Sequence, residues 1–226
     1  MKPSSGRAVA AILASALCIV GERSVSALPE EAESCLACHS TDGGGAAVSL
    51  AGFDASIHKS LTCTSCHTGA TEAPHPVQPP PVDCGDCHAS AARGTKTSPH
   101  GRALSSGKGK KPAAACLICH GGKAHAIAAV ADPRSPTSRS RQLSLCESCH
   151  QDPAKTPAHL SRLHPVSTYL KTVHGLKAAE GNTKAALCGD CHGTHDIRPG
   201  IAAASRVSRN RIAETCGRCH ESQSTA

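Results

Sequence analysis

The sequence is poor in the large side chains that normally fill a protein interior. Among its 226 residues there are no tryptophans, one tyrosine (Tyr169), one phenylalanine (Phe53) and one methionine (Met1). Aromatic side chains dominate the buried area of ordinary cores, so their shortage argues against a conventional hydrophobic core. It also argues against a nucleic-acid-binding protein that stacks bases on aromatic rings. No alternating stretch is long enough to predict a sheet.

Other residue types are unusually frequent. The chain has 15 cysteines, 15 histidines, 20 glycines and 15 prolines. This composition is typical of a loop-rich chain that is organised by covalent or metal cross-links rather than by apolar packing.

The first 27 residues have the pattern of an export signal. A basic start is followed by an apolar run over residues 8–20 and by Val25-Ser26-Ala27, which resembles a cleavage site. A retained membrane anchor is the alternative, but this run is shorter than the ~20 residues that span a bilayer. We expect cleavage before Leu28, which would remove Cys18 with the signal.

All fourteen remaining cysteines belong to one pattern, C-x-x-C-H. The seven copies are Cys35-Cys38-His39, Cys63-Cys66-His67, Cys84-Cys87-His88, Cys116-Cys119-His120, Cys146-Cys149-His150, Cys188-Cys191-His192 and Cys216-Cys219-His220. In c-type haem attachment, two thiols about one turn apart form thioethers to the vinyl groups and the adjacent histidine binds the iron. Zinc sites and thiol redox centres also use C-x-x-C, but they do not require this histidine.

On these motifs the sequence from residue 35 to residue 220 resembles the multihaem c-type cytochromes, in a version similar to the class III and related periplasmic types. The resemblance implies seven covalently attached haems as cofactors. It implies that the fourteen motif cysteines hold the haems and that the seven motif histidines are proximal iron ligands. Bis-histidine ligation and a role in electron transport are further implications.

The formal charge of +7 does not indicate a nucleic-acid partner. Loss of residues 1–27 removes three basic residues and one acidic residue, which leaves +5. Each haem would add two propionates against one net positive ferric centre, so seven haems would bring the oxidised protein to about −2.

Distal iron ligands must come from outside the motifs. Met1 leaves with the signal, so the mature chain cannot use His/Met ligation. Eight histidines remain for seven irons: His58, His75, His100, His125, His159, His164, His174 and His195.

Six of these histidines recur in three similar units. Each unit opens with a Ser or Thr two residues before a histidine and continues with a motif, a second free histidine and a second motif. The units run Ser56, His58, Cys63, His75, Cys84; Ser98, His100, Cys116, His125, Cys146; and Thr172, His174, Cys188, His195, Cys216. The recurrence predicts that these six histidines are distal ligands.

One haem, at Cys35, and two linker histidines, His159 and His164, are left over. We expect one of the two to complete the first haem and the other to be solvated or to lie near a propionate. Phe53 and Tyr169 each lie five residues before the opening histidine of their unit, where a ring would pack on haem.

The mature chain leaves about 28 residues per haem, too few to wrap each porphyrin separately. We therefore predict a mainly α and irregular fold, with short helices and loops around closely packed covalent haems and little or no β-sheet. The predicted organisation is a signal peptide (1–27), an N-terminal haem module (28–50), two-haem units at 51–92 and 93–150, a linker (151–168) and a third two-haem unit (169–226).

Residues 89–130 contain seven Lys or Arg and no Asp or Glu. This stretch is either a solvated loop that neutralises propionates or a docking patch for an acidic redox partner.

The leading functional hypothesis is a periplasmic electron carrier of anaerobic respiration, not an enzyme. It would accept electrons from a membrane quinol-oxidising complex or dehydrogenase and pass them to a terminal reductase or another cytochrome. The alternative is a reductase of a small oxyanion with one open haem, although all seven motifs keep their histidine. A third hypothesis is a subunit of a haem polymer at the outer surface or outside the cell.

Overall fold

The computed structural model describes residues 30–40, 46–105, 113–157 and 162–220, and within these ranges the chain is helical or irregular. No strand occurs in them, which confirms the prediction of a mainly α fold without a sheet. The described helices are short, and the longest, α1, has ten residues. The elements are α1 (Glu30–His39), α2 (Leu50–Asp54), η1 (Cys63–Ser65), η2 (Cys84–Asp86), α3 (Ala89–Thr97), α4 (Pro99–Ser105), α5 (Ala114–His120), η3 (Ala124–Ala126), α6 (Gln142–His150), α8 (Pro165–Leu170), α9 (Val173–Ala179), α10 (Cys188–His192) and α11 (Ile212–Gly217).

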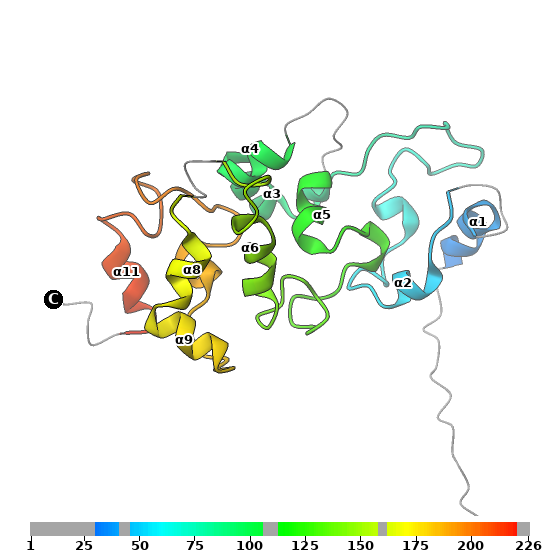
Figure 1. Ribbon diagram of the computed structural model, residues 1–226. Helices are drawn as coiled ribbons and strands as arrows, with labels where there is room; N and C mark the ends of the chain where they lie inside the picture. The colour runs from blue at the N-terminus through cyan, green and yellow to red at the C-terminus, as the bar shows by residue number, and fades with distance from the viewer. Residues whose placement is uncertain (1–29, 41–45, 106–112, 158–161, 221–226) are drawn as a thin grey trace, which may run out of the picture.

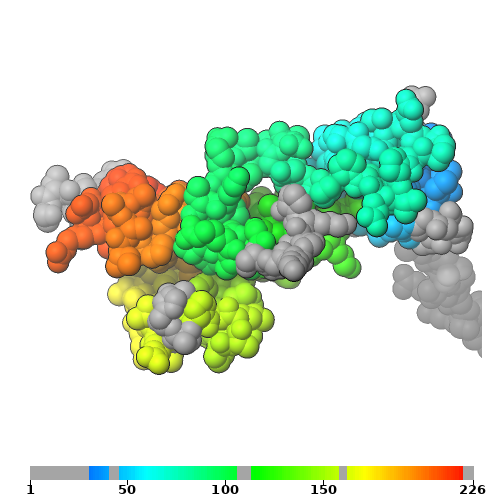
Figure 2. Space-filling model, turned by 90° about the horizontal axis from the view of Figure 1, so that it is seen from above, coloured from blue at the N-terminus to red at the C-terminus, as the bar shows by residue number. Residues whose placement is uncertain are grey.

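The molecule is elongated. Helix α1 lies at one end and α11 at the other, with α5 and α6 between them (Figure 1). The space-filling view has the same order, with N-terminal residues at one end and C-terminal residues at the other (Figure 2). Segments therefore follow one another along the molecule roughly as they do along the chain.

The interior of the described part is made of small side chains. Five apolar residues are buried, and three of them are alanines: Ala32, Ala115, Val166, Ala185 and Leu187. The buried polar residues are all serines or threonines: Ser56, Ser98, Ser135, Ser138, Thr156, Ser205, Ser208 and Thr215. These side chains do not make an apolar core of ordinary volume, in agreement with the shortage of aromatic residues.

A capped helix start fixes the opening histidine of the third unit. The Thr172 hydroxyl accepts a hydrogen bond from the Gly175 amide (3.1 Å), which caps α9. Gly175 lies directly against the Tyr169 carbonyl, where a Cβ atom would overlap it. His174, between cap and glycine, therefore has a defined direction. The second unit repeats this arrangement with Ser98, His100, Gly101 and the Thr95 carbonyl.

The first unit uses its opening serine differently. Buried Ser56 donates to the Ile127 carbonyl (3.2 Å) and accepts from the His58 amide (3.2 Å). The Ile57 amide donates to the same carbonyl of Ile127 (2.8 Å). These bonds join the first unit to the second rather than capping a helix.

Two segments with the pattern S-x-x-S-R-x-R fold alike. Residues 135–141 precede α6 and residues 205–211 precede α11. In both, the second serine amide donates to the first serine carbonyl, and the last arginine amide donates to the second serine carbonyl, at 2.9–3.1 Å. The serines are buried because successive turns bring them to the inside.

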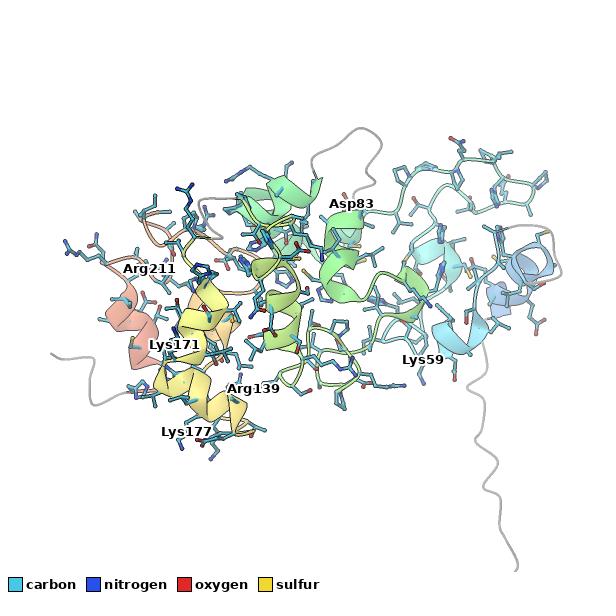
Figure 3. All side chains as sticks on the ribbon, in the orientation of Figure 1. Lys59, Asp83, Arg139, Lys171, Lys177 and Arg211 are labelled. Carbon is cyan, nitrogen blue, oxygen red and sulfur yellow. The ribbon has the colours of Figure 1, made fainter. Side chains whose placement is uncertain are left out.

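The first of these segments holds the third unit in place through Arg139. Its guanidinium donates to the carbonyls of Thr183 (2.5 Å) and Ala185 (2.6 Å) and pairs with Asp190 (3.1 Å; Figure 3). The segment before α10 is thereby fastened to the segment before α6. Arg209 has the same position in the second copy, but its exposed side chain has no recorded hydrogen bond or ion pair with another described residue.

We predict that Arg139→Ala lowers the free energy of unfolding by about 2 kcal/mol, because two carbonyls lose a charged donor. The half-exposed ion pair with Asp190 contributes little to this figure. Arg209→Ala is the matched control and should leave thermal unfolding unchanged. Equal melting temperatures for the two variants would contradict this account of Arg139.

Gly175→Ala should destabilise the protein by roughly 1–3 kcal/mol, because the added methyl group would overlap the Tyr169 carbonyl. At Gly200 a Cβ would meet Val207 at an ordinary 3.7 Å, so Gly200→Ala serves as the control. Denaturant unfolding compares the two variants. A Gly175→Ala protein as stable as the control would show that the helix start has room to shift.

Candidate functional site: six facing histidine pairs

The C-x-x-C-H motifs each close a turn of backbone. In the three motifs that a helix covers only in part, the motif histidine amide still donates to the carbonyl of the first cysteine, at 2.9, 2.8 and 3.0 Å for His67, His88 and His220. Residues three and four positions apart on such a turn lie on one side. Both thiols and the imidazole of a motif are therefore presented together.

Each of six motif histidines faces one free histidine across a narrow gap. The ring centroids are 5.8–6.2 Å apart in all six pairs. The pairs are His39 with His75, His88 with His58, His67 with His125, His150 with His100, His120 with His195 and His220 with His174.

This separation fits one metal ion between two imidazoles. Imidazole nitrogens bind metals at about 2 Å and the ring centroid lies roughly 1 Å behind the nitrogen, so a shared ion places the centroids about 6 Å apart. Among the described residues, no three His, Cys, Asp or Glu side chains form a metal-binding group. Each pair thus offers two donors, which suits an iron that brings four porphyrin nitrogens of its own.

Four of the paired imidazoles lie in surroundings that favour their neutral form. Burial, and next the facing imidazole, lower the pKa of His58, His67, His100 and His120. The neutral imidazole is the form that binds iron. The Nδ1 atoms of His100 and His150 are buried and have no hydrogen-bond partner among the described residues, which is unusual for buried polar atoms.

Cysteines of successive motifs contact one another. Burial and then the neighbouring Cys35 thiol raise the pKa of Cys63 to about 11. Burial and then Cys116 raise the pKa of Cys84. A hydrogen bond with Cys188 raises the pKa of Cys146.

The second cysteines make the remaining links. Burial is the main cause of the raised pKa of Cys66, Cys119 and Cys191. Cysteines of the next motif raise each pKa further: Cys87 and Cys84 act on Cys66, and Cys149 acts on Cys119. Cys216 and Cys219 act on Cys191. Each motif therefore lies beside the next one in the sequence, and the seven form a single file.

The pairing follows one rule across the repeat. The opening histidine of each unit faces the second motif of its own unit, as His174 faces His220. The second free histidine faces the first motif of the preceding segment, as His195 faces His120. The N-terminal module obeys the same rule, because His39 faces His75 of the first unit.

The structure corrects one expectation. We expected a linker histidine to complete the first motif, but His39 faces His75 instead. All six unit histidines do face a motif histidine. The motif histidine without a facing imidazole among the described residues is His192. His164 is exposed and in no ring pair, and His159 lies outside the described residues.

Sequence reasoning missed two features of the site. One is the glycine after His100 and His174, which could have been noticed because both units contain it. The other is the S-x-x-S-R-x-R segment, which recurs at a spacing of 70 residues from 135 to 205. The glycines act by packing backbone against backbone, and the first S-x-x-S-R-x-R segment acts through the Arg139 side chain.

No family model, no curated protein and no solved structure matches this chain.

Proposed function

We propose that this chain is an exported c-type cytochrome that carries seven covalent haems and transfers electrons between redox proteins. The six facing histidine pairs support the proposal most directly. Each joins a histidine of a haem-attachment motif to a histidine outside the motifs, at the separation that a doubly ligated iron needs.

In this proposal the haem supplies reversible one-electron chemistry at its iron. The protein attaches each haem through two thioethers and holds two imidazoles at fixed separation. Its buried serines, threonines and alanines leave room for large flat groups, which would complete the interior in place of aromatic side chains. No residue has to act as an acid or base, and on this account the chain is not an enzyme.

The single file of motifs supports a relay. Contacts between successive cysteines run from the motif in α1 to the motif that begins in α11, at opposite ends of the molecule (Figure 1). Haems attached to neighbouring cysteines would lie close together. Electrons would then pass along the chain order, entering at one end and leaving at the other.

Location and partners follow from the same proposal. The periplasm, reached through cleavage of residues 1–27, is where we place the protein, and the signal itself lies outside the described residues. Its partners would be a quinol-oxidising complex or dehydrogenase upstream and a terminal reductase or another cytochrome downstream. None of the described helices has the length and apolar character needed to cross a membrane.

The alternative, a reductase of a small oxyanion, has one observation in its favour. Among the described residues no imidazole faces His192, so an iron there would need another sixth ligand. An open position at this iron would bind a small molecule. Six of the seven motifs nevertheless have a facing histidine, as an electron carrier requires.

The purified protein should have the mass of the chain from about Leu28 plus seven haems, with only low-spin ferric iron in its electron spin resonance spectrum. Thioether attachment and paired imidazoles give both results. A mass without haem would reject the proposed function, whereas a persistent high-spin signal in a seven-haem protein would favour the reductase.

The pairing of His195 with His120 can be tested with double variants. Because both face one gap, His120→Ala combined with His195→Ala should perturb one haem, seen as loss from the mass or as high-spin iron. His120→Ala combined with His125→Ala should perturb two, since His125 faces His67. Equal counts in the two proteins would contradict the pairing.

A further inference from the structure

The pairing rule leaves a specific gap at the third unit. By this rule the histidine that faces His192 would belong to a following unit, just as His195 of the third unit faces His120 of the second. The six pairs contain six of the eight free histidines, and the other two in the sequence are His159 and His164. Both lie in the linker that precedes the third unit.

This linker is peculiar to the third unit. Twelve positions separate His88 from His100, whereas 24 separate His150 from His174. The additional residues contain the only two mature histidines that have no place in the repeat. The linker therefore supplies two further imidazoles immediately before the unit whose first motif has no facing histidine among the described residues.

The end of the linker packs against the motif of His192. Helix α8 begins at the end of the linker and contacts α6 (Figure 1). Its Val166 is buried. Its Tyr169 hydroxyl donates to the Ala186 carbonyl (2.8 Å), two residues before Cys188. Burial, and next the charges of Cys188, Asp190 and Cys191, raise the pKa of Tyr169, which places this ring beside the motif.

His164 stands at the start of this helix in a strained conformation. Its φ of 42° makes it the one non-glycine residue with positive φ in the described part of the chain. Such a conformation costs about 1–3 kcal/mol and recurs at functional sites. Five residues separate His164 from Tyr169, about 7.5 Å along a helix axis.

The His164 side chain is free to bind. Its ring is exposed and has no recorded hydrogen bond with another described residue, while its carbonyl accepts from the Thr168 amide (2.9 Å) and the Ser167 hydroxyl (3.1 Å). The helix start therefore anchors the backbone and leaves the imidazole unused. The ring does not face His192 in the structure, so ligation requires rotation of this side chain.

We propose that His164 of the linker is the sixth ligand of the iron held by His192. This inference rests on the proposed function, since it requires a haem at Cys188 and Cys191. It makes the seventh iron six-coordinate like the others. It also predicts that the first motif of the third unit is completed from its N-terminal side, unlike the three motifs whose facing histidine comes from the following unit.

The test compares His164→Ala with His159→Ala in the full-length haem-loaded protein. In His164→Ala, one of seven haems should become high-spin when ferric and should bind carbon monoxide when ferrous. His159→Ala and the unaltered protein should bind none. His164→Met adds a variant that keeps a ligand at the position, and its iron should stay low-spin with a shifted reduction potential.

Other results would overturn the proposal. Carbon monoxide binding by one haem of the unaltered protein would mean an open iron. A carbon monoxide site in His159→Ala but not in His164→Ala would assign the ligand to His159. Seven attached haems in each variant, verified by mass, separate these outcomes from failure of the proposed function, in which no haem is attached at all and both proposals fall.

Discussion

The separation of about 6 Å between the ring centroids of facing imidazoles is the constraint on which the rest of this structure depends. Two rings held that far apart cannot pack against each other closely, so most elements around them act to fix position. The threonine cap and the glycine beside His174 are examples. Buried small side chains are another, because they allow backbone segments to approach one another closely.

The same constraint brings neighbouring units together, because three of the pairs join histidines of different units. His195 faces His120 of the second unit, and His75 faces His39 of the N-terminal module. If an iron joins each pair, every such bond also joins two units, and binding of the cofactor contributes to folding. Arg139 adds a link between units that needs no cofactor, because its hydrogen bonds join the segments before α6 and α10.

Much of the candidate site could be predicted from the sequence. The seven motifs are local patterns, and the recurrence of Ser98-x-His100 and Thr172-x-His174 singled out histidines that the structure places beside motif histidines. The absence of strands within the described ranges also agreed with prediction, because neither aromatic residues nor alternation favoured a sheet. These features depend on residues close together in the chain.

The pairing could not be predicted in this way. His39 and His75 are 36 positions apart, and His120 and His195 are 75 apart, and no local pattern states which motif a free histidine serves. The most economical assignment gave the leftover motif at Cys35 a linker histidine. In the structure the second free histidine of each unit faces a motif of the preceding segment. The motif without a facing histidine among the described residues is therefore that of His192, not that of His39.

Iron positions from anomalous X-ray scattering by crystals of the purified protein would test the central claim most directly. The account predicts six irons, each midway between the two rings of one of the six facing pairs, and a seventh beside His192. Irons absent from these midpoints, or an iron between His39 and a histidine other than His75, would contradict it.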